Sequence, residues 1–250
     1  MNLQEFVGQT RLIEELKAMV KRKNWCFILR GHYGFGKTTL AIILAAAFGL
    51  YSYQIPHKGE ITLDRKCKVH VVDETHLVRE FEPLYEHMDY YNFIFCTNMA
   101  SKLPEPFMSR CYTYRLEPYT LPELTEIVGV HSKFNNTPLC VDTCRFVAAR
   151  SKGVPRNAVK LMERYTAICS ARRQPFNVDT AATVFQEIGI DDTGLTELDR
   201  KYLTAVSTHP KSQKTLMAVL DVDQTELERM EHYLIHQGLV EITSRGRLAT

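Results

Sequence analysis

Residues 25–40 read WCFILRGHYGFGKTTL, and this stretch decides the class of fold. Trp25 to Arg30 is a short apolar run that predicts a buried strand. The next eight residues, Gly31 to Thr38, match the pattern G-x-x-x-x-G-K-[ST] and open a helix of small residues. A strand, a glycine-rich turn and a helix in this order are typical of a phosphate-binding loop. The alternative is a glycine-rich turn that matches by chance, but such a turn requires neither a strand before it nor a helix after it.

The residue types of this loop suit a nucleoside triphosphate. Glycines let backbone N–H groups turn inward around phosphate oxygens, and the helix N-terminus adds partial positive charge. Lys37 is predicted to reach the β and γ phosphates, and the hydroxyl of Thr38 to bind Mg²⁺. The nucleotide-binding residues predicted in the loop are Gly31, Gly34, Gly36, Lys37, Thr38 and Thr39.

Two carboxylates follow a second apolar run. Val69 to Val72 predicts a strand, and Asp73 and Glu74 come directly after it. Burying charge is costly unless the protein uses it, and an ATPase uses both groups. Asp73 would hold Mg²⁺ through its water shell, and Glu74 would orient and deprotonate the attacking water. Solvated acids at a strand end are the alternative, which the upstream phosphate loop disfavours, so we expect ATP and Mg²⁺ as cofactors.

The composition is that of a globular chain with two or three small domains. The 250 residues are 45% apolar and 24% charged, which excludes disordered and collagen-like chains. A net charge of +2 announces no polyanion partner for the chain as a whole. The longest uncharged apolar stretch, Leu40 to Tyr51, is too short for a membrane span, and the N-terminus has no secretory apolar core. We therefore expect a cytoplasmic protein with no membrane partner.

The chain divides into three sections with different patterns, the third of which is residues 191–250. Apolar runs at 25–30, 69–72 and 93–96 alternate with helical segments, which predicts an α/β fold with a parallel sheet in residues 1–118. The pattern of residues 119–190 is helical, and we interpret this section as a small all-helical domain.

Capping signals mark the helices of the second section. Thr120 and Glu123 form a capping box at the start of one helix. Asp142 is placed to cap the next helix, and Pro155 suits the first residue of a third.

Residues 191–250 have the pattern of a winged helix. An amphipathic helix is predicted over Thr196 to Ser207, Ser212 caps a short second helix, and Asp223 opens a third. The tail from Leu239 to Thr250 alternates about a Ser-Arg-Gly turn like a β-hairpin. Three helices followed by a hairpin is the order of a winged-helix domain.

Several segments, taken in order, resemble the AAA+ ATPases and, within them, the RuvB family of Holliday-junction branch-migration motors. The phosphate loop is common to many NTPases, whereas the last two segments are far more specific. The resemblance covers most of the chain and implies an AAA+ core, a helical lid domain and a C-terminal winged helix. The matching segments are EFVGQ (Glu5 to Gln9), GHYGFGKTTLA, VVDETH, FCTN (Phe95 to Asn98), PFMSR (Pro106 to Arg110), LEPYT (Leu116 to Thr120), SKGVPRNAVKL, IDDTGLTELDRKYL and YLIHQGLVEITSRGRLAT.

The resemblance implies three further catalytic residues. Asn98 matches the sensor-1 amide, with Thr97 as the other candidate, and a turn-forming asparagine is the alternative. Arg110 matches the arginine finger, which reaches across a subunit boundary to the neighbour's nucleotide. Arg156 matches sensor 2, which links the γ-phosphate to the helical lid. An ordinary solvated arginine is the alternative for both.

Nucleotide and DNA contacts follow from the same resemblance. Val7 and Tyr119 fall where the family lines its adenine pocket, although a place in the apolar core suits both equally. Arg245 and Arg247 are two apart on the predicted hairpin, where they would project to one face and hold DNA phosphates. A solvated arginine pair is the alternative. Residues 191–250 carry 7 basic and 10 acidic side chains. Because this section is acidic overall, we expect any DNA contact there to be confined to a small surface.

The chain departs from the family at three places. Only 18 residues separate Glu74 from Phe93, which leaves no room for the β-hairpin with which RuvB engages its partner RuvA. A pore loop has room only in reduced form, near His57 to Lys66. Met108 stands where the family has another arginine. We therefore predict a compact variant of the family.

These patterns together predict an ATP-hydrolysing homo-oligomer, a hexameric ring or a spiral, that moves duplex or branched DNA with a replication or recombination protein as partner. One alternative is an ATP-driven loader or targeting switch that does not translocate. The alternative of another class is a non-catalytic DNA-binding adaptor that keeps nucleotide for structure only. ATPase rates with and without DNA separate the enzyme from the adaptor.

Overall fold

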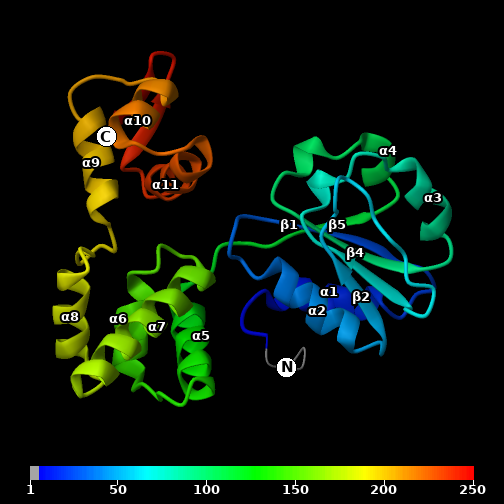
Figure 1. Ribbon diagram of the computed structural model, residues 1–250, viewed down its shortest axis with the longest axis horizontal. Coiled ribbons are helices and arrows are strands. Elements are labelled where there is room, and N and C mark those ends of the chain that lie inside the picture. The colour runs from blue at the N-terminus through cyan, green and yellow to red at the C-terminus, as the bar shows by residue number, and fades with distance from the viewer. Residues whose placement is uncertain (1–5) are drawn as a thin grey trace. The chain divides into compact units, whose positions relative to one another are not determined.

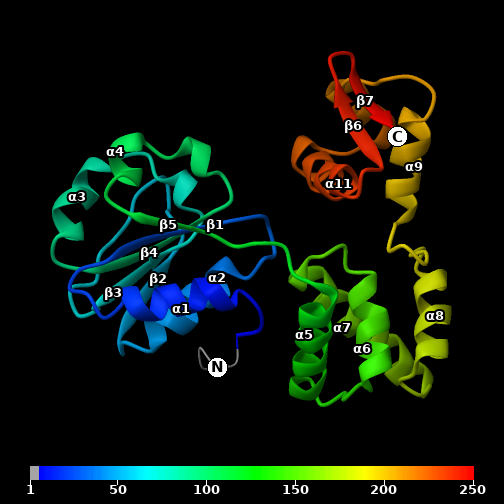
Figure 2. The ribbon, with the colours of Figure 1, turned by 180° about the vertical axis from the view of Figure 1, so that it is seen from behind.

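The structure is a computed structural model that describes residues 6–250, shown from two sides in Figures 1 and 2. Glu5, the first residue of the predicted EFVGQ match, lies outside the described residues. No helix in the described part of the chain is both long enough and apolar enough to cross a membrane.

The chain forms two compact units whose boundary passes through two helices. The predicted domain boundaries at residues 118 and 190 stay predictions, because each of the two units combines segments that are separated in the sequence. The first unit contains Met1–Ile127 and Gly153–Val159, and the second contains Val128–Lys152 and Lys160–Thr250.

A five-stranded sheet, parallel throughout, forms the centre of the first unit (Figure 1). Its strands are β1 (Cys26–Arg30), β2 (Tyr51–Gln54), β3 (Val69–Val72), β4 (Asn92–Thr97) and β5 (Tyr112–Arg115). The strand order is β2-β3-β4-β1-β5, so the strand that leads into the phosphate loop lies inside the sheet. In the register, Ile28 of β1 lies between Phe95 of β4 and Thr113 of β5.

The apolar runs predict β1, β3 and β4 correctly and miss β2 and β5. Both missed strands lie at the edges of the sheet. Their sequences, YSYQ and YTYR, carry polar side chains because an edge strand is not buried on every side. Neither strand therefore forms the continuous apolar run by which a buried parallel strand is recognised.

Helices cover both faces of this sheet. They are α1 (Thr10–Met19), α2 (Lys37–Ala46), α3 (Glu82–Met88) and α4 (Glu105–Met108). In both views α1 and α2 lie on one face, and α3 and α4 lie on the other (Figures 1 and 2). Ile28 and Phe95 belong to the apolar cluster that also contains Leu84 of α3 and Phe107 of α4. Because both faces are covered, ligands have access at the ends of the strands, and in such sheets they bind at the carboxyl ends.

The helical section begins as its capping signals predict. Its helices are α5 (Leu121–Phe134), α6 (Val141–Ala149), α7 (Pro155–Arg172) and α8 (Val178–Glu187). The backbone N–H and the hydroxyl of Thr120 both donate to the Glu123 carboxylate at 2.7 Å, which confirms the capping box. Pro155 is the first residue of α7, also as predicted.

The prediction that Asp142 caps α6 is wrong. The helix begins at Val141, and the capping position, two residues before Asp142, is held by Cys140, whose φ of −69° and ψ of 159° are extended. The Cys140 sulfur lies 3.1 Å from the Thr143 hydroxyl. Asp142 therefore falls in the first turn, where its charge favours the positive end of the helix.

The elements of the predicted winged helix are present in the order expected. They are α9 (Glu197–Val206), α10 (Gln213–Leu220), α11 (Gln224–His236), β6 (Val240–Thr243) and β7 (Gly246–Ala249). Thr196 and Asp199 form a capping box before α9, and the side chains of Ser212 and Asp223 cap the next two helices. Gly238, with a φ of 68°, follows the end of α11, and β6 and β7 pair as an antiparallel hairpin.

A buried ion pair ties the hairpin to α11. Arg247 Nε donates to Glu231 Oε1 at 2.9 Å, and Arg247 Nη2 donates to Glu231 Oε2 at 3.1 Å. The side chains of Arg247 and Glu231 are only 18% and 6% exposed. The Tyr202 hydroxyl of α9 donates to the same carboxylate at 3.0 Å, and burial together with that carboxylate raises the pKa of Tyr202.

We expect Glu231→Ala to lower the free energy of unfolding by about 3 kcal/mol, because Arg247 and the Tyr202 hydroxyl would lose their shared acceptor. Urea denaturation followed by circular dichroism measures the change. Glu228→Ala alters an exposed position of the same helix and should change stability by less than about 0.5 kcal/mol. Equal effects of the two substitutions would contradict a stabilising role for the ion pair.

Candidate nucleotide site

The phosphate loop connects β1 with α2 at the carboxyl end of the sheet. Gly34 and Gly36 have φ values of 77° and 88°, in the left-handed region that side chains disfavour. Lys37 Nζ donates to the carbonyl oxygens of Gly31 and His32 at 2.9 Å each. Burial lowers the pKa of the Lys37 ammonium. The loop therefore holds a desolvated cation on carbonyl groups that phosphate oxygens can replace.

The beginning of α7 contacts this loop. A Cβ on Gly34 would lie 2.8 Å from Val154 Cγ1 and 2.9 Å from Arg156 Cβ, so the contact requires glycine. The backbone N–H of Arg156 donates to the Gly34 carbonyl at 3.3 Å. The Arg156 side chain is exposed. The structure thus brings the predicted sensor-2 arginine to the phosphate loop.

The two predicted metal-binding side chains are in direct contact. Thr38 Oγ1 donates to Asp73 Oδ2 at 2.7 Å, across the gap between α2 and the end of β3. The backbone N–H of Glu74 donates to Asp73 Oδ1 at 2.9 Å. Tyr53 on β2 also donates to Asp73 Oδ2, at 3.2 Å, a contact that no local pattern predicts because it depends on strand pairing. Thr39 lies exposed in the first turn of α2.

Glu74 has an unusual backbone conformation. Its φ of 46° and ψ of 45° are left-handed, a conformation that costs a non-glycine residue about 1 kcal/mol or more. Its side chain is 37% exposed, and its Oε2 lies 3.5 Å from His76 Nδ1. Burial lowers the pKa of His76, which keeps this ring neutral near pH 7. The Glu74 carboxylate therefore stays accessible beside a neutral imidazole. No sequence pattern indicates that His76 lies at this site.

Of the two candidates for sensor 1, Asn98 has the unused hydrogen-bonding group. Its Oδ1 is buried and has no hydrogen-bond partner among the described residues. Thr97, in contrast, accepts from the backbone N–H of Met99 at 3.0 Å, and its hydroxyl lies 3.3 Å from His76 Nδ1. A buried, unsatisfied amide oxygen is costly unless a ligand or water fills it, so Asn98 fits the sensor role better.

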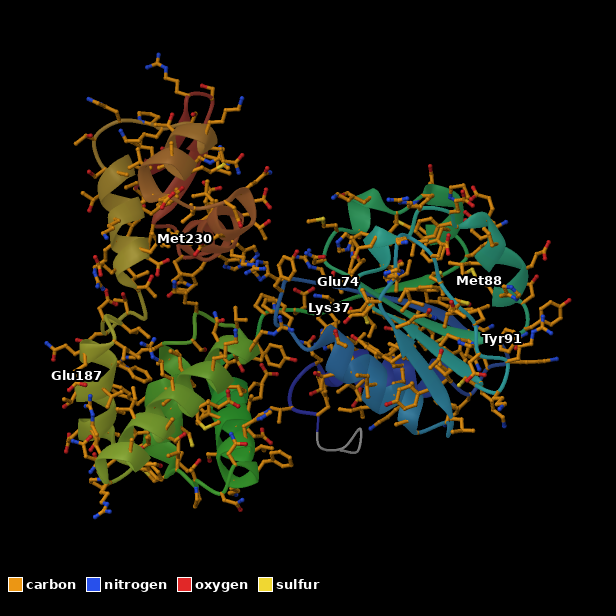
Figure 3. All side chains as sticks on the ribbon, in the orientation of Figure 1. Lys37, Glu74, Met88, Tyr91, Glu187 and Met230 are labelled. Atoms are coloured by element: carbon orange, nitrogen blue, oxygen red, sulfur yellow. The ribbon has the colours of Figure 1, made fainter. Side chains whose placement is uncertain are left out.

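The predicted arginine finger is exposed and held in place. Arg110 Nη1 donates to the Pro106 carbonyl at 2.7 Å, and its guanidinium lies over the Tyr85 ring, 4.5 Å from the ring centre. Figure 3 shows Lys37 and Glu74 close together at one end of the sheet. In the described structure Arg110 forms no ion pair, so its charge is available to another molecule.

The two residues predicted at the adenine pocket have different surroundings. Tyr119 is buried and its hydroxyl donates to the Phe35 carbonyl at 3.0 Å, so it holds the backbone of the phosphate loop. Val7 is half-buried in the segment that leads to α1. Gln9 fixes this segment by donating to and accepting from the backbone of Glu117, at 2.7 and 3.1 Å. Their contact with adenine stays a prediction.

The prediction that both arginines lie on one strand of the hairpin is wrong. Arg245 lies in the turn between β6 and β7 and is exposed. Arg247 lies on β7 and is held by the buried carboxylate of Glu231. A carboxylate from α11 therefore removes Arg247 from the candidate DNA-binding residues, and Arg245 remains.

The segments on either side of β3 are short. Residues 73–91 contain a single-turn helix at Thr75–Leu77 and α3, and no strand, which agrees with the predicted lack of an inserted hairpin. The loop after β2 folds back on itself, since the Gln54 side chain donates to and accepts from the backbone of Thr62. A reduced pore loop near His57 to Lys66 stays a prediction.

Comparisons with known proteins point in one direction. The model of the RuvB C-terminal winged helix domain matches residues 192–250. The chain is similar to the Holliday junction branch migration complex subunit RuvB of Rubrobacter xylanophilus, with 28% identity over 99% of this chain and 83% of the relative. It is 27% identical to the same subunit of Campylobacter hominis, over 98% of this chain and 86% of the relative. The solved structure of the Thermotoga maritima RuvB Holliday junction branch migration motor superposes with a TM-score of 0.86 at 26% identity, covering 100% of this chain and 94% of that chain.

The parallel sheet, the phosphate loop and the Thr38–Asp73 contact, followed by a helical section, define a P-loop ATPase of the AAA+ class. Within this class, the match of residues 192–250 to the RuvB winged helix and the similarity over nearly the whole chain point to RuvB. The chain is a RuvB-like AAA+ ATPase with a C-terminal winged-helix domain.

Proposed function

We propose that the chain hydrolyses ATP between the subunits of a homo-oligomer and uses hydrolysis to act on duplex or branched DNA. The observation that carries this proposal is the contact of Thr38 with Asp73 beside the Lys37 loop, with Glu74 directly after Asp73. The relatives named as subunits of the Holliday junction branch migration complex support branched DNA as the substrate.

The residues of the site fit ATP and Mg²⁺. The hydroxyl of Thr38 and the carboxylate of Asp73 are the hard oxygen ligands that Mg²⁺ prefers. Bound Mg²⁺ would neutralise charge on the phosphates. Lys37 and the backbone N–H groups of the loop would hold the phosphate oxygens, and the unpartnered Oδ1 of Asn98 would accept a hydrogen bond from the attacking water.

Glu74 is suited to remove the proton of that water. Its carboxylate is accessible, and His76 beside it is neutral because burial lowers the pKa of the imidazole. Among the described residues, no lysine or arginine forms an ion pair with Glu74. Its left-handed backbone stands between the end of β3 and the single-turn helix Thr75–Leu77.

Arg110 makes the site a shared one. The guanidinium is exposed and supported by Tyr85 and Pro106, and it has no acidic partner within the described chain. A cation held in this way can stabilise charge that develops on the nucleotide of a neighbouring subunit. We therefore propose an oligomer, a hexameric ring or a spiral, in which each subunit completes its neighbour's site.

One observation favours a loader or targeting switch as the second candidate. The family hairpin that engages RuvA has no counterpart in residues 73–91, which argues against coupling to a partner of that kind. A chain without this attachment can still grip DNA or a replication protein in the ATP state and release it afterwards. The adaptor alternative is disfavoured, because Lys37, Glu74 and Arg110 are all present.

The test is ATP hydrolysis by the full chain with Mg²⁺, measured alone, with linear duplex and with a four-way junction. We expect hydrolysis that rises with DNA, that falls when the metal is chelated, and that Lys37→Ala abolishes. Migration of a labelled junction would support the motor, and stimulated hydrolysis without migration would support the loader. A parent rate no higher than that of Lys37→Ala would contradict both and leave the adaptor.

A further inference from the structure

Two short basic segments lie at the end of the sheet opposite the phosphate loop. One precedes β1 and the other precedes β3, so both reach the edge formed by the amino ends of the strands. Figure 3 shows Met88 and Tyr91 at this end, away from Lys37 and Glu74. We name the surface the amino-end patch, and its cations are Lys21, Arg22, Lys23, Arg65, Lys66 and Lys68.

Backbone hydrogen bonds bring the two segments together. The Lys68 carbonyl accepts from the N–H of Asn92 at 3.3 Å, and the Trp25 carbonyl accepts from the N–H of Phe93 at 3.1 Å. The Asn92 side chain in turn accepts from the N–H of Trp25 at 3.0 Å. The residues just before β3, β4 and β1 therefore lie side by side, although they are far apart in the sequence.

The positive charge of this patch is concentrated and only partly compensated. All six cationic side chains are exposed, and none forms an ion pair within residues 6–250. Segments 21–25, 64–68 and 89–92 contain six cations and two carboxylates, Asp64 and Asp89, a local net charge of +4. The whole chain has only +2 and residues 191–250 have −3, so positive charge is gathered here. Like charges held together repel one another, and a polyanion relieves that repulsion.

Exposed aromatic rings flank these cations. Tyr90, between α3 and β4, is 78% exposed, and Tyr112, at the start of β5, is 47% exposed. Arg22 Nη1 donates to the Tyr112 hydroxyl at 3.4 Å, which places one of the rings beside the basic segment. A hollow of about 400 Å³ lies next to it, and its lining includes Asn24, Arg110 and Tyr112 together with two acidic residues, Glu86 and Asp89. Exposed rings beside cations are suited to unpaired bases, because each base has a face that can stack.

We propose that the amino-end patch binds single-stranded nucleic acid, with the six cations on the phosphates and Tyr90 and Tyr112 against the bases. Duplex DNA fits less well, since its bases are already stacked and cannot reach the rings. This inference goes beyond the proposed function, because the patch lies at the end of the sheet opposite the phosphate loop. It requires no ATP, so it can hold true even if the chain hydrolyses none.

The experiment measures binding of the full chain to a fluorescein-labelled oligothymidylate by fluorescence anisotropy, with chelator and without nucleotide. Lys21→Ala/Lys23→Ala should weaken binding about tenfold or more at low salt. It should also reduce the slope of log affinity against log salt by about 1.4, since each phosphate contact on a single strand contributes about 0.7. The matched control is Lys160→Ala/Arg164→Ala, two exposed cations of α7, and thermal unfolding checks that each variant is folded.

A second substitution separates base contacts from charge. Tyr90→Ala should weaken binding of oligothymidylate about fivefold or more and leave binding of duplex unchanged. Equal effects of Lys21→Ala/Lys23→Ala and its control would overturn the proposal, as would equally tight binding of a polyglutamate peptide. Loss of all binding in Arg245→Ala, with no loss in the patch variant, would also overturn it while leaving the proposed function intact.

Discussion

Arg110→Ala is expected to lower the turnover of ATP by about a thousandfold or more, because arginine fingers contribute about 10³ to 10⁵ in rate. The affinity for ATP should stay close to that of the parent. The guanidinium is exposed, rests on the Tyr85 ring and is tied to the Pro106 carbonyl, so its own subunit uses it only for support. Its loss therefore removes a charge from the transition state of a neighbour without changing how this subunit holds phosphate.

Steady-state hydrolysis and binding of a fluorescent ATP analogue measure the two quantities. Arg115→Ala is the matched control, since Arg115 is an exposed arginine of the same unit with only an exposed carboxylate beside it. Mixing Arg110→Ala with Lys37→Ala, each inactive alone, should restore part of the activity, because some interfaces then combine an intact loop with an intact finger. Parent-like turnover by the Arg110 variant, or no recovery on mixing, would contradict the shared site.

Glu74→Gln is expected to lower ATP hydrolysis by about 10² to 10⁴, the usual contribution of a general base. Glutamine keeps the size of the side chain and removes its basicity. The contacts of Thr38 with Asp73 and of Lys37 with the loop do not involve the Glu74 carboxylate, so binding of ATP should be retained. Bound ATP that is not hydrolysed should then favour the assembled oligomer.

Single-turnover hydrolysis measures the chemical step, and light scattering with ATP measures assembly. Glu80→Gln, an exposed position after the same strand, should behave like the parent in both experiments. Rapid hydrolysis by the Glu74 variant would show that another group takes the proton. A variant that neither hydrolyses nor binds ATP would place Glu74 in nucleotide binding instead. The two predicted variants thus differ: only Glu74→Gln should accumulate assemblies with ATP bound.

Much of the site can be predicted from the sequence because its parts are local. The phosphate loop needs residues within one strand, one turn and one helix, and the left-handed φ of Gly34 and Gly36 agrees with the motif. Asp73 and Glu74 follow a strand that its three valines identify, and Asn98 follows another. The capping box of Thr120 spans only three residues. Each feature depends on backbone geometry over a few neighbours, so a short pattern is sufficient.

Contacts between distant segments could not be predicted in this way. Tyr53 reaches Asp73 only because β2 pairs with β3, and β2 has no apolar run that marks it. The predicted cap of α6, Asp142, lies two residues after the true one, because Cys140 adopts the extended capping conformation. The two segments of the amino-end patch meet only because β1 and β3 both pair with β4.

The sequence by itself determined the class of protein, the phosphate loop and the order of the sections. Only the tertiary structure decided which charged groups are free to act. Arg245 and Arg247 are alike in sequence, yet Glu231 of another element holds Arg247, while Arg245 stays exposed. The reason is physical: local patterns follow from bonded geometry, whereas the availability of a charge depends on which side chains the fold brings within hydrogen-bonding distance.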